Sequence, residues 1–388
     1  MLKRQIRPLH TGILATIVVL ITIPFPATML RAQLSPATPK TTDQTFKNIQ
    51  TLKGIPADQL IPTMQFISAS LGVECEYCHV EGAFEKDDKK PKQTARKMME
   101  MVFGINKVNF ENRREVTCYS CHRGTTQPVG IPIIPAGTDT IRSGSPTITA
   151  SDARADNQGT NLAAVVEPIV EKYIAALGGT GSIQKVTTRI EKGSADLAGK
   201  QFPIEIYSQA PDKRMTVMHL PNGDSITGYN GTVGWRSVPG RPVQWMSPAE
   251  ADASRLDTDL LLALHMKEMF SDLRVLPAEK IDGHDVNVLQ GLREGKPPVT
   301  FYLDQQSGLL LRRLEYIDTA LGLNPTQIDY ADYRDSGNVK VSYRWTVARP
   351  RGRFTIQIES VQQNVPIDAR KFVAPAGTTS DQKLPPAR

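Results

Sequence analysis

Apolar residues in the first third of the chain recur with the period of an α-helix. One set, at spacings of four, three and four residues, is Leu60, Met64, Ile67 and Leu71. A second set with helical spacing is Met98, Met101, Val102 and Ile105. Residues at such spacings share one face of a helix, so the sequence predicts two amphipathic helices, the first of which ends at Gly72.

From about residue 161 onward, apolar and polar residues alternate instead, which indicates β-strands. The alternating runs are 202–207, 214–219, 233–238, 299–303, 309–316, 339–347 and 354–358. Turn sequences such as Asn222-Gly223 and Asn230-Gly231 separate them. We therefore expect antiparallel strands joined by short connections.

Two helices are expected beside these strands, at 162–177 and at 247–270. A glycine pair closes the first, and Ser247 with Glu250 begins the second at capping-box spacing. Together the patterns predict an α+β protein. A small, mainly α-helical domain precedes a separate, antiparallel β-rich domain that resembles a half-barrel.

Changes in composition mark the expected domain boundaries. Prolines that forbid regular helix end the first domain, and a polar stretch rich in Ser, Thr, Asp and Gly follows it. The expected segments are a signal peptide at 1–32, a first domain at 33–135, a flexible linker at 136–160, a β-rich domain at 161–376 and a disordered tail at 377–388.

The first 32 residues have the features of a secretory signal peptide. A basic start is followed by an apolar run at 13–24 and by small residues up to Ala32, after which cleavage is expected. Arg31 lies close to that cut, so an uncleaved signal anchor is the alternative, which would leave the protein attached to the membrane. Either way, we expect a periplasmic or cell-envelope protein.

The net charge falls from +6 to +2 once this leader is removed. Four of the 46 basic residues lie in it, so the remaining 42 exceed the 40 acidic residues by only two. A nearly neutral protein is not expected to bind nucleic acid.

One pentapeptide pattern, Cys-x-x-Cys-His, occurs twice and uses every cysteine of the chain. The copies are Cys75-Glu76-Tyr77-Cys78-His79 and Cys118-Tyr119-Ser120-Cys121-His122. This pattern attaches c-type haem, because one helical turn presents two thiols to the haem vinyl groups and the imidazole meets the iron. A redox disulfide or a four-cysteine zinc site is the alternative, but neither requires the histidine.

Each iron also needs a sixth ligand, and methionine is the donor at hand. Between residues 33 and 135 the only histidines are those of the two motifs, whereas the methionines are Met64, Met98, Met99 and Met101. Met64 is expected to serve the first haem. Met98 and Met101 share a face, so periodicity does not choose between them for the second, while Met99 points away into the packing. His/Met ligation raises the potential and suits electron transfer rather than peroxide chemistry.

Residues 60–124 resemble the cytochrome c subunit of photosynthetic reaction centres. The resemblance rests on the run from Met64 through His79, on Ala95-Arg-Lys-Met-Met-Glu-Met101 and on Val116-Thr-Cys-Tyr-Ser-Cys-His-Arg-Gly124. It implies that Met64 and Met98 are axial ligands. The family subunit carries four haems and a further histidine, which 106–117 lacks here. A dihaem half with an electron-transfer role is therefore implied, but docking on a reaction centre is not.

The element order of the β-rich domain resembles LolA-like lipoprotein carriers. That resemblance would imply an apolar concave surface able to hold a hydrophobic ligand such as an acyl chain, whereas a plain β-domain for docking or stability is the simpler expectation. His219, His265 and His284 have no metal-ligand spacing and are expected to be solvated or hydrogen-bonded. The charged run 85–92 is expected to be a solvated loop.

The sequence thus predicts an exported dihaem c-type cytochrome that transfers single electrons and is not an enzyme. Its cofactors would be two covalently attached haem c groups, and its partners redox proteins, including those of a membrane-bound complex. The predicted cofactor-binding residues are Cys75, Cys78, Cys118 and Cys121, and the iron ligands are His79, Met64, His122 and Met98. A dihaem peroxidase or oxidoreductase subunit, and lipid or lipoprotein binding by the C-terminal domain, are the alternatives.

Overall fold

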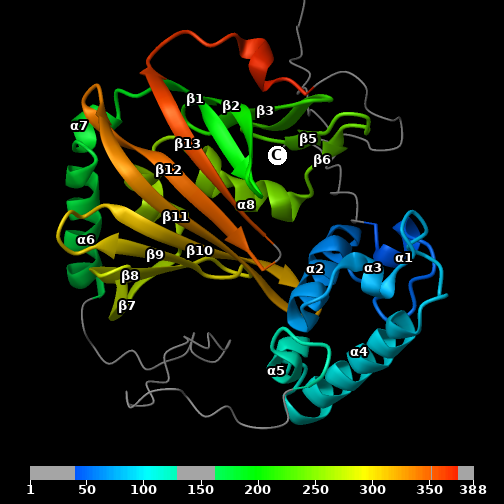
Figure 1. Ribbon diagram of the computed structural model, residues 1–388. Coiled ribbons are helices and arrows are strands. Elements are labelled where there is room, and N and C mark those ends of the chain that lie inside the picture. The colour runs from blue at the N-terminus through cyan, green and yellow to red at the C-terminus, as the bar shows by residue number, and fades with distance from the viewer. Residues whose placement is uncertain (1–39, 129–161, 351, 375–388) are drawn as a thin grey trace, which may run out of the picture. The chain divides into compact units, whose positions relative to one another are not determined.

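The computed structural model describes residues 40–128, 162–350 and 352–374 (Figure 1). These residues belong to one compact unit, Pro39–Arg388. The predicted signal peptide at 1–32, linker at 136–160 and tail at 377–388 lie outside the described residues. In the described part of the chain, no helix is long and apolar enough to cross a membrane.

The first described segment is helical. Its elements are α1 (Thr42–Thr45), η1 (Ala57–Gln59), α2 (Leu60–Leu71), α3 (Cys75–Cys78), α4 (Lys90–Asn109) and α5 (Cys118–His122). Both predicted amphipathic helices are present, as α2 and α4. Helix α2 ends at Gly72 in the left-handed conformation, with φ 65°, which glycine adopts without steric cost.

The neighbouring residue Gly124 also requires glycine at position 72. A Cβ atom at residue 72 would collide with the carbonyl oxygen of Gly124, just beyond α5. The Gly124 amide donates a hydrogen bond to the Ser70 carbonyl oxygen at 2.9 Å. The end of α2 is thereby fixed against the end of the second Cys-x-x-Cys-His motif.

The second described segment combines five short helices with a large sheet. The helices are α6 (Leu162–Ala176), α7 (Thr180–Ile183), α8 (Pro248–Thr258), α9 (Leu262–Met269) and η3 (Ala369–Phe372). The strands are β1 (Thr188–Leu197), β2 (Lys200–Gln209), β3 (Lys213–Leu220), β4 (Gly223–Asn230), β5 (Gly234–Ser237), β6 (Gln244–Trp245), β7 (Asp272–Ile281), β8 (His284–Leu292), β9 (Val299–Asp304), β10 (Leu310–Thr319), β11 (Gly322–Ser336), β12 (Val339–Arg349) and β13 (Gly352–Gln363). The chain is therefore α+β.

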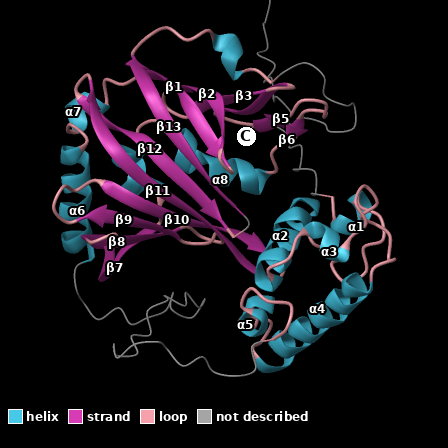
Figure 2. Ribbon diagram, in the orientation of Figure 1, coloured by secondary structure: helices cyan, strands magenta, loops and turns pink. Residues whose placement is uncertain are grey.

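All thirteen of these strands form one antiparallel sheet, in the order β6-β5-β4-β3-β2-β1-β13-β12-β11-β10-β9-β8-β7 (Figure 2). Every neighbouring pair is also consecutive in sequence, except β1 and β13, which join the two halves. Because β6 and β7 are unpaired edges in the described chain, the sheet is open rather than closed into a barrel.

The predicted single helix at 247–270 is wrong in its length, because the structure has two helices there. Its start is confirmed: the Ser247 hydroxyl accepts from the Glu250 amide at 3.2 Å, and the Glu250 carboxylate accepts from the Ser247 amide at 2.9 Å. Asp259 then ends α8 in an extended conformation, and its carboxylate accepts from the Leu261 amide at 2.9 Å. An aspartate that bonds its own neighbouring backbone competes with helix continuation.

Helices α6, α8 and α9 pack on the sheet through one apolar core. Its buried members are Val166, Val170, Tyr173, Leu256, Ala263, Met266, Phe270, Leu289, Val299, Phe301, Leu303 and Leu310. Beside it, Arg313 of β10 is only 2% exposed and bonds Asp257 of α8 and Glu315 of β10. The side of the sheet that faces these helices is thus filled with protein side chains.

The helical segment has a separate core that includes one buried residue from a hairpin turn of the β-rich segment. The buried members are Leu52, Leu60, Phe66, Ile67, Met99 and Leu321. Leu321 is 2% exposed and lies in the two-residue turn between β10 and β11. The tip of this hairpin therefore completes the core around α2.

Candidate haem sites

Each Cys-x-x-Cys-His motif folds as a single helical turn. In the first, α3 spans both cysteines, and the His79 amide donates to the Cys75 carbonyl oxygen at 3.0 Å. In the second, α5 spans Cys118–His122. No disulfide joins the four cysteines, all of which lie in the described residues. One turn of helix brings the two thiols of each motif to the same side, as attachment to two vinyl groups requires.

The histidine of each motif is held in the same tautomer. His79 Nδ1 lies 2.9 Å from the Phe84 carbonyl oxygen, and His122 Nδ1 lies 3.0 Å from that of Thr125. A carbonyl oxygen only accepts, so Nδ1 carries the proton and donates it in both rings. The lone pair of Nε2 is then available, and this is how a histidine ligand is usually oriented toward a metal.

In each motif one thiol has a pKa shifted in the direction opposite to that of a redox cysteine. Burial raises the pKa of Cys78 above its ordinary value and that of Cys118 to about 11. A reactive Cys-x-x-Cys pair needs a thiolate, which a lowered pKa provides. Across the described residues, no three His, Cys, Asp or Glu side chains are grouped so that they could hold a metal ion, as a four-cysteine zinc site would require.

The methionines of α4 separate into a buried one and an exposed pair. Met99 is 6% exposed and packs in the helical core, as its expected packing role requires. Met98 and Met101 are 37% and 47% exposed, and Val108, seven residues beyond Met101 on the same face, is 80% exposed. An exposed row of apolar side chains of this kind on a helix usually marks a site where another apolar group binds. A haem attached at a neighbouring motif is a flat, largely apolar group of the kind that fits it.

The two halves of the helical segment interlock. Helix α2 packs against α5, and α3 packs against α4. Met64 is half-buried against the same apolar cluster as Cys118, the first cysteine of the second motif. Met98 and Met101 share their exposed face, so the preference for Met98 continues to rest on the resemblance.

The expectation of a solvated loop at 85–92 is wrong for its last residues. Lys90, Pro91 and Lys92 form the first turn of α4, and Lys92 is only 9% exposed. Its ammonium donates to the carbonyl oxygens of Phe84 and Lys86 at 2.9 and 2.7 Å. Pro91 was the available signal, because proline is favoured in the first turn of a helix.

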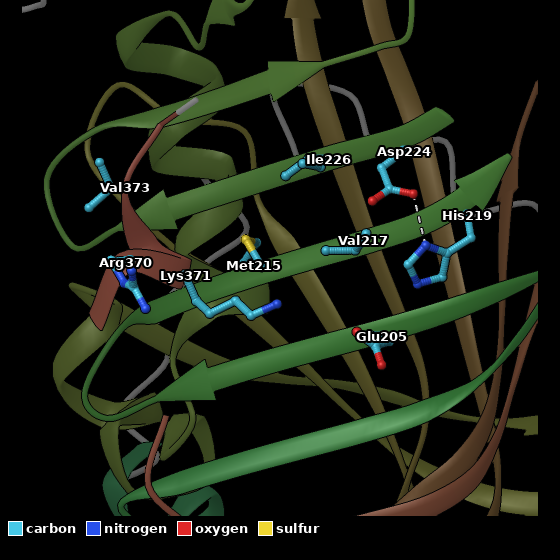
Figure 3. Close-up of a pocket in the computed structure, with 9 residues that line it drawn as sticks. All are labelled: Glu205, Met215, Val217, His219, Asp224, Ile226, Arg370, Lys371 and Val373. Carbon is cyan, nitrogen blue, oxygen red and sulfur yellow. Dashed lines mark hydrogen bonds and ion pairs between the residues drawn. The ribbon is translucent and has the colours of Figure 1, made fainter. Parts of the chain in front are cut away.

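The three histidines of the β-rich segment are hydrogen-bonded, as expected. Their Nδ1 atoms pair with aspartates: His219 with Asp224 at 2.8 Å, His265 with Asp259 at 2.8 Å, and His284 with Asp304 at 3.1 Å. Figure 3 shows the first pair, on β3 and β4, at the rim of a surface pocket of about 270 Å³. The Glu205 carboxylate at this pocket is also paired, with Lys192 at 2.7 Å.

Comparisons with known proteins agree with the resemblance predicted above. The chain is 34% identical over 89 residues to the photosynthetic reaction center cytochrome c subunit of Thermochromatium tepidum, which is 22% of each chain. It is 37% identical over 81 residues to cytochrome c-554 of Chloroflexus aurantiacus, covering 19% of this chain and 20% of that one. The alignments thus span about a fifth of the length of these curated relatives.

Solved structures similar to the chain include a DUF1329 family protein from Desulfovibrio piger and a LolA superfamily protein from Nitrosomonas europaea. The first has a TM-score of 0.39 and 15% identity, and the second 0.38 and 12%. Both alignments cover 54% of this chain and 97% of the other. In sequence, residues 24–196, which hold both Cys-x-x-Cys-His motifs, match the family of the photosynthetic reaction centre cytochrome C subunit.

Proposed function

We propose that this protein is an exported c-type cytochrome that carries two covalently attached haems and passes single electrons between redox proteins. The observation that carries the proposal is the pair of equivalent sites: each motif is one helical turn whose histidine donates from Nδ1 to a backbone carbonyl oxygen. The backbone at the histidines differs, since His79 is extended and His122 is helical. The shared helical turn through the cysteines and the shared Nδ1 donor nevertheless argue for the same group in each site.

In this proposal Cys75 and Cys78 hold the first haem by thioether bonds, with His79 as the ligand on one side of the iron. Cys121 and Cys118 hold the second, with His122 in the equivalent place. When bound, the haem iron supplies a one-electron couple between its ferric and ferrous states.

Met64 and Met98 are proposed as the sixth ligands. A thioether opposite an imidazole leaves the iron without an open position, which favours electron transfer over oxygen or peroxide chemistry. The exposed apolar face of α4 around Met98 would exclude water from one haem. Exclusion of water stabilises the ferrous state, because the ferric site carries the extra charge.

Export and partners are part of the same proposal. The leader at 1–32 would direct the chain to the periplasm or cell envelope, where covalent haem attachment takes place. The partners would be redox proteins, and the similarity to a reaction centre subunit makes a membrane-bound complex one candidate setting.

The test is to produce the full chain in a host that matures c-type haem and to measure its intact mass and absorption spectrum. We expect the added mass of two haems and the weak red band of methionine sulfur on ferric iron. Two haem-free cysteine pairs would refute the proposal. Turnover of peroxide by a high-spin iron would refute the electron-carrier role and favour an enzyme.

The methionines provide matched variants for the ligand assignment. Met98→Leu should remove the red band of one haem, whereas Met101→Leu on the same face and the buried Met99→Leu should keep it. Met64→Leu should remove the band of the other haem. Loss of the band in Met101→Leu, with Met98→Leu unchanged, would transfer the ligand role to Met101.

A further inference from the structure

The first motif has a feature that the second lacks in the described residues: a buried cation bonded to the partner of its histidine. The Phe84 carbonyl oxygen accepts from His79 Nδ1 at 2.9 Å and also from Lys92 Nζ at 2.9 Å. Lys92 reaches this oxygen from the first turn of α4, with only 9% of its surface exposed. One carbonyl oxygen therefore joins the proposed iron ligand to an ammonium group.

The surrounding chain keeps this ammonium in place. Lys92 Nζ also donates to the Lys86 carbonyl oxygen at 2.7 Å and pairs with Asp87 Oδ1 at 3.0 Å. Asp87 Oδ2 is in turn bonded by Arg96 at 2.9 Å. The backbone of 84–87 thus wraps around Lys92, and both of its carbonyl acceptors are fixed by local structure.

The second motif is built with neutral partners. His122 Nδ1 donates to the Thr125 carbonyl oxygen at 3.0 Å, and the Thr125 hydroxyl donates back to the His122 carbonyl oxygen at 2.9 Å. No lysine or arginine of the described chain is bonded to that Thr125 oxygen. Two sites with the same five-residue pattern therefore differ by one buried ammonium group, which is paired with Asp87.

Such a charge acts on the iron in two ways, and both have the same sign. An ammonium that shares the carbonyl oxygen weakens the hydrogen bond from Nδ1, so the imidazole becomes a poorer electron donor. The positive charge of the ammonium also opposes the additional positive charge of ferric iron, and Asp87, whose side chain is 35% exposed, offsets part of it. Both effects stabilise the ferrous state and raise the reduction potential.

We propose that Lys92 is a positioning residue that acts through Phe84 and His79 to hold the reduction potential of the first haem above that of the second. The proposal rests on the proposed function, since it requires a haem at each motif. An electron that enters the chain then comes to rest at the first motif: the second haem is oxidised by one electron and the first is reduced by that same electron.

The test is a spectroelectrochemical titration of the full, haem-loaded chain, in which two one-electron waves are resolved. Lys92→Gln removes the charge but keeps a hydrogen-bond donor. We expect the ferric-to-ferrous ratio of one haem to rise about tenfold at fixed ambient potential, which corresponds to a wave about 59 mV lower. The other wave should stay in place. The Met64→Leu and Met98→Leu variants identify which wave belongs to which haem.

Arg96→Gln is the matched control, because it removes one positive charge that also bonds Asp87, from the same helix α4 as Lys92, without touching the Phe84 oxygen. It should shift the first wave clearly less than Lys92→Gln does. Lys92→Arg keeps the positive charge, so the reduction potential of the first haem should stay close to that of the wild type. Asp87→Asn keeps Lys92 but removes its counter-charge, so it should move the same wave upward.

The outcomes distinguish a failure of the Lys92 proposal from a failure of the proposed function. Unchanged waves in a folded, doubly loaded Lys92→Gln protein would overturn it, as would an equal shift in Arg96→Gln. If Lys92→Gln fails to load haem, a downward or absent shift in Asp87→Asn overturns it instead. A wild-type chain without two haems refutes the proposed function. Nitrogen-15 NMR of the His79 ring provides a second readout, because a stronger Nδ1 hydrogen bond in Lys92→Gln moves the Nδ1 resonance.

Discussion

Arg313→Met is the substitution for which the structure predicts the largest loss of stability in the β-rich segment. The guanidinium is 2% exposed, and it bonds the Asp257 carboxylate, the Glu315 carboxylate at 2.5 Å and the Leu256 carbonyl oxygen at 3.2 Å. The bonds to Asp257 and Leu256 connect α8 to β10. Methionine fills much of the same volume, so the change removes the charge more than the packing.

The size of the stability loss follows from the carboxylate that remains without a partner. The Glu315 side chain is only 16% exposed, so without Arg313 its carboxylate is buried without its main cation. Removing one partner of a buried ion pair costs about 3–5 kcal/mol. For a segment of roughly 200 residues each kcal/mol lowers Tm by about 2–4 °C, so a decrease of about 6–20 °C is expected.

The pH dependence gives a second check on the cause. Burial raises the pKa of Glu315 above 4.5, and Arg313 opposes that rise. A carboxyl group whose folded-state pKa is raised favours folding when protonated, so its penalty is absent below the unfolded-state pKa and grows as the pH rises through the folded-state pKa. The destabilisation in Arg313→Met should therefore shrink as the pH is lowered toward 5.

Tryptophan fluorescence is a suitable assay, because all three tryptophans, Trp235, Trp245 and Trp345, lie in β5, β6 and β12. The double variant Arg313→Met with Glu315→Leu is the matched control, since it removes the stranded carboxylate and should recover most of the loss. A Tm change below about 2 °C in the single variant, or no recovery in the double one, would refute this account of the cluster.

Three further predictions concern the helical segment. Leu321→Ala should cost about 2–5 kcal/mol, because it truncates a core residue that is only 2% exposed. Unfolding followed by haem absorbance should then precede the tryptophan transition, and coincident transitions in this variant would contradict the prediction. Gly72→Ala should lower the fraction of chains with two haems in the intact mass, because the left-handed φ and the Gly124 carbonyl both oppose a Cβ; an undiminished fraction would show that this contact is dispensable. Hydrogen bonds from Arg96, then Asn48 and Lys92, hold the pKa of Asp87 below its ordinary 3.8. The ionised Asp87 therefore stabilises the fold fully above pH 3.8, and this stabilisation is lost as the pH falls through the folded-state pKa. Asp87→Asn should make acid unfolding, measured by circular dichroism, depend less on pH below 3.8, and an unaltered acid transition would exclude this role of Asp87.

Local sequence was sufficient for features whose cause lies within a few residues. The spacing of Cys75, Cys78 and His79 predicts covalent haem attachment without reference to the rest of the fold, because a short local segment supplies all three groups. The end of α2 at Gly72 and the capping box at Ser247 were likewise predictable, since each depends on backbone groups close by in the chain.

Features that depend on distant residues were decided by the tertiary structure alone. The pairing of β1 with β13 joins strands more than 150 residues apart, and no local pattern specifies it. Leu321 occupies a hairpin turn, where an exposed residue is the usual expectation, yet it is buried against α2. Lys92 belongs to a charged run typical of solvent, but the loop at 84–87 folds around its ammonium and brings it to the oxygen that holds His79. Sequence determined which groups are predicted to bind haem, whereas the tertiary structure decided which charges surround them, because electrostatic effects follow distance in space rather than separation along the chain.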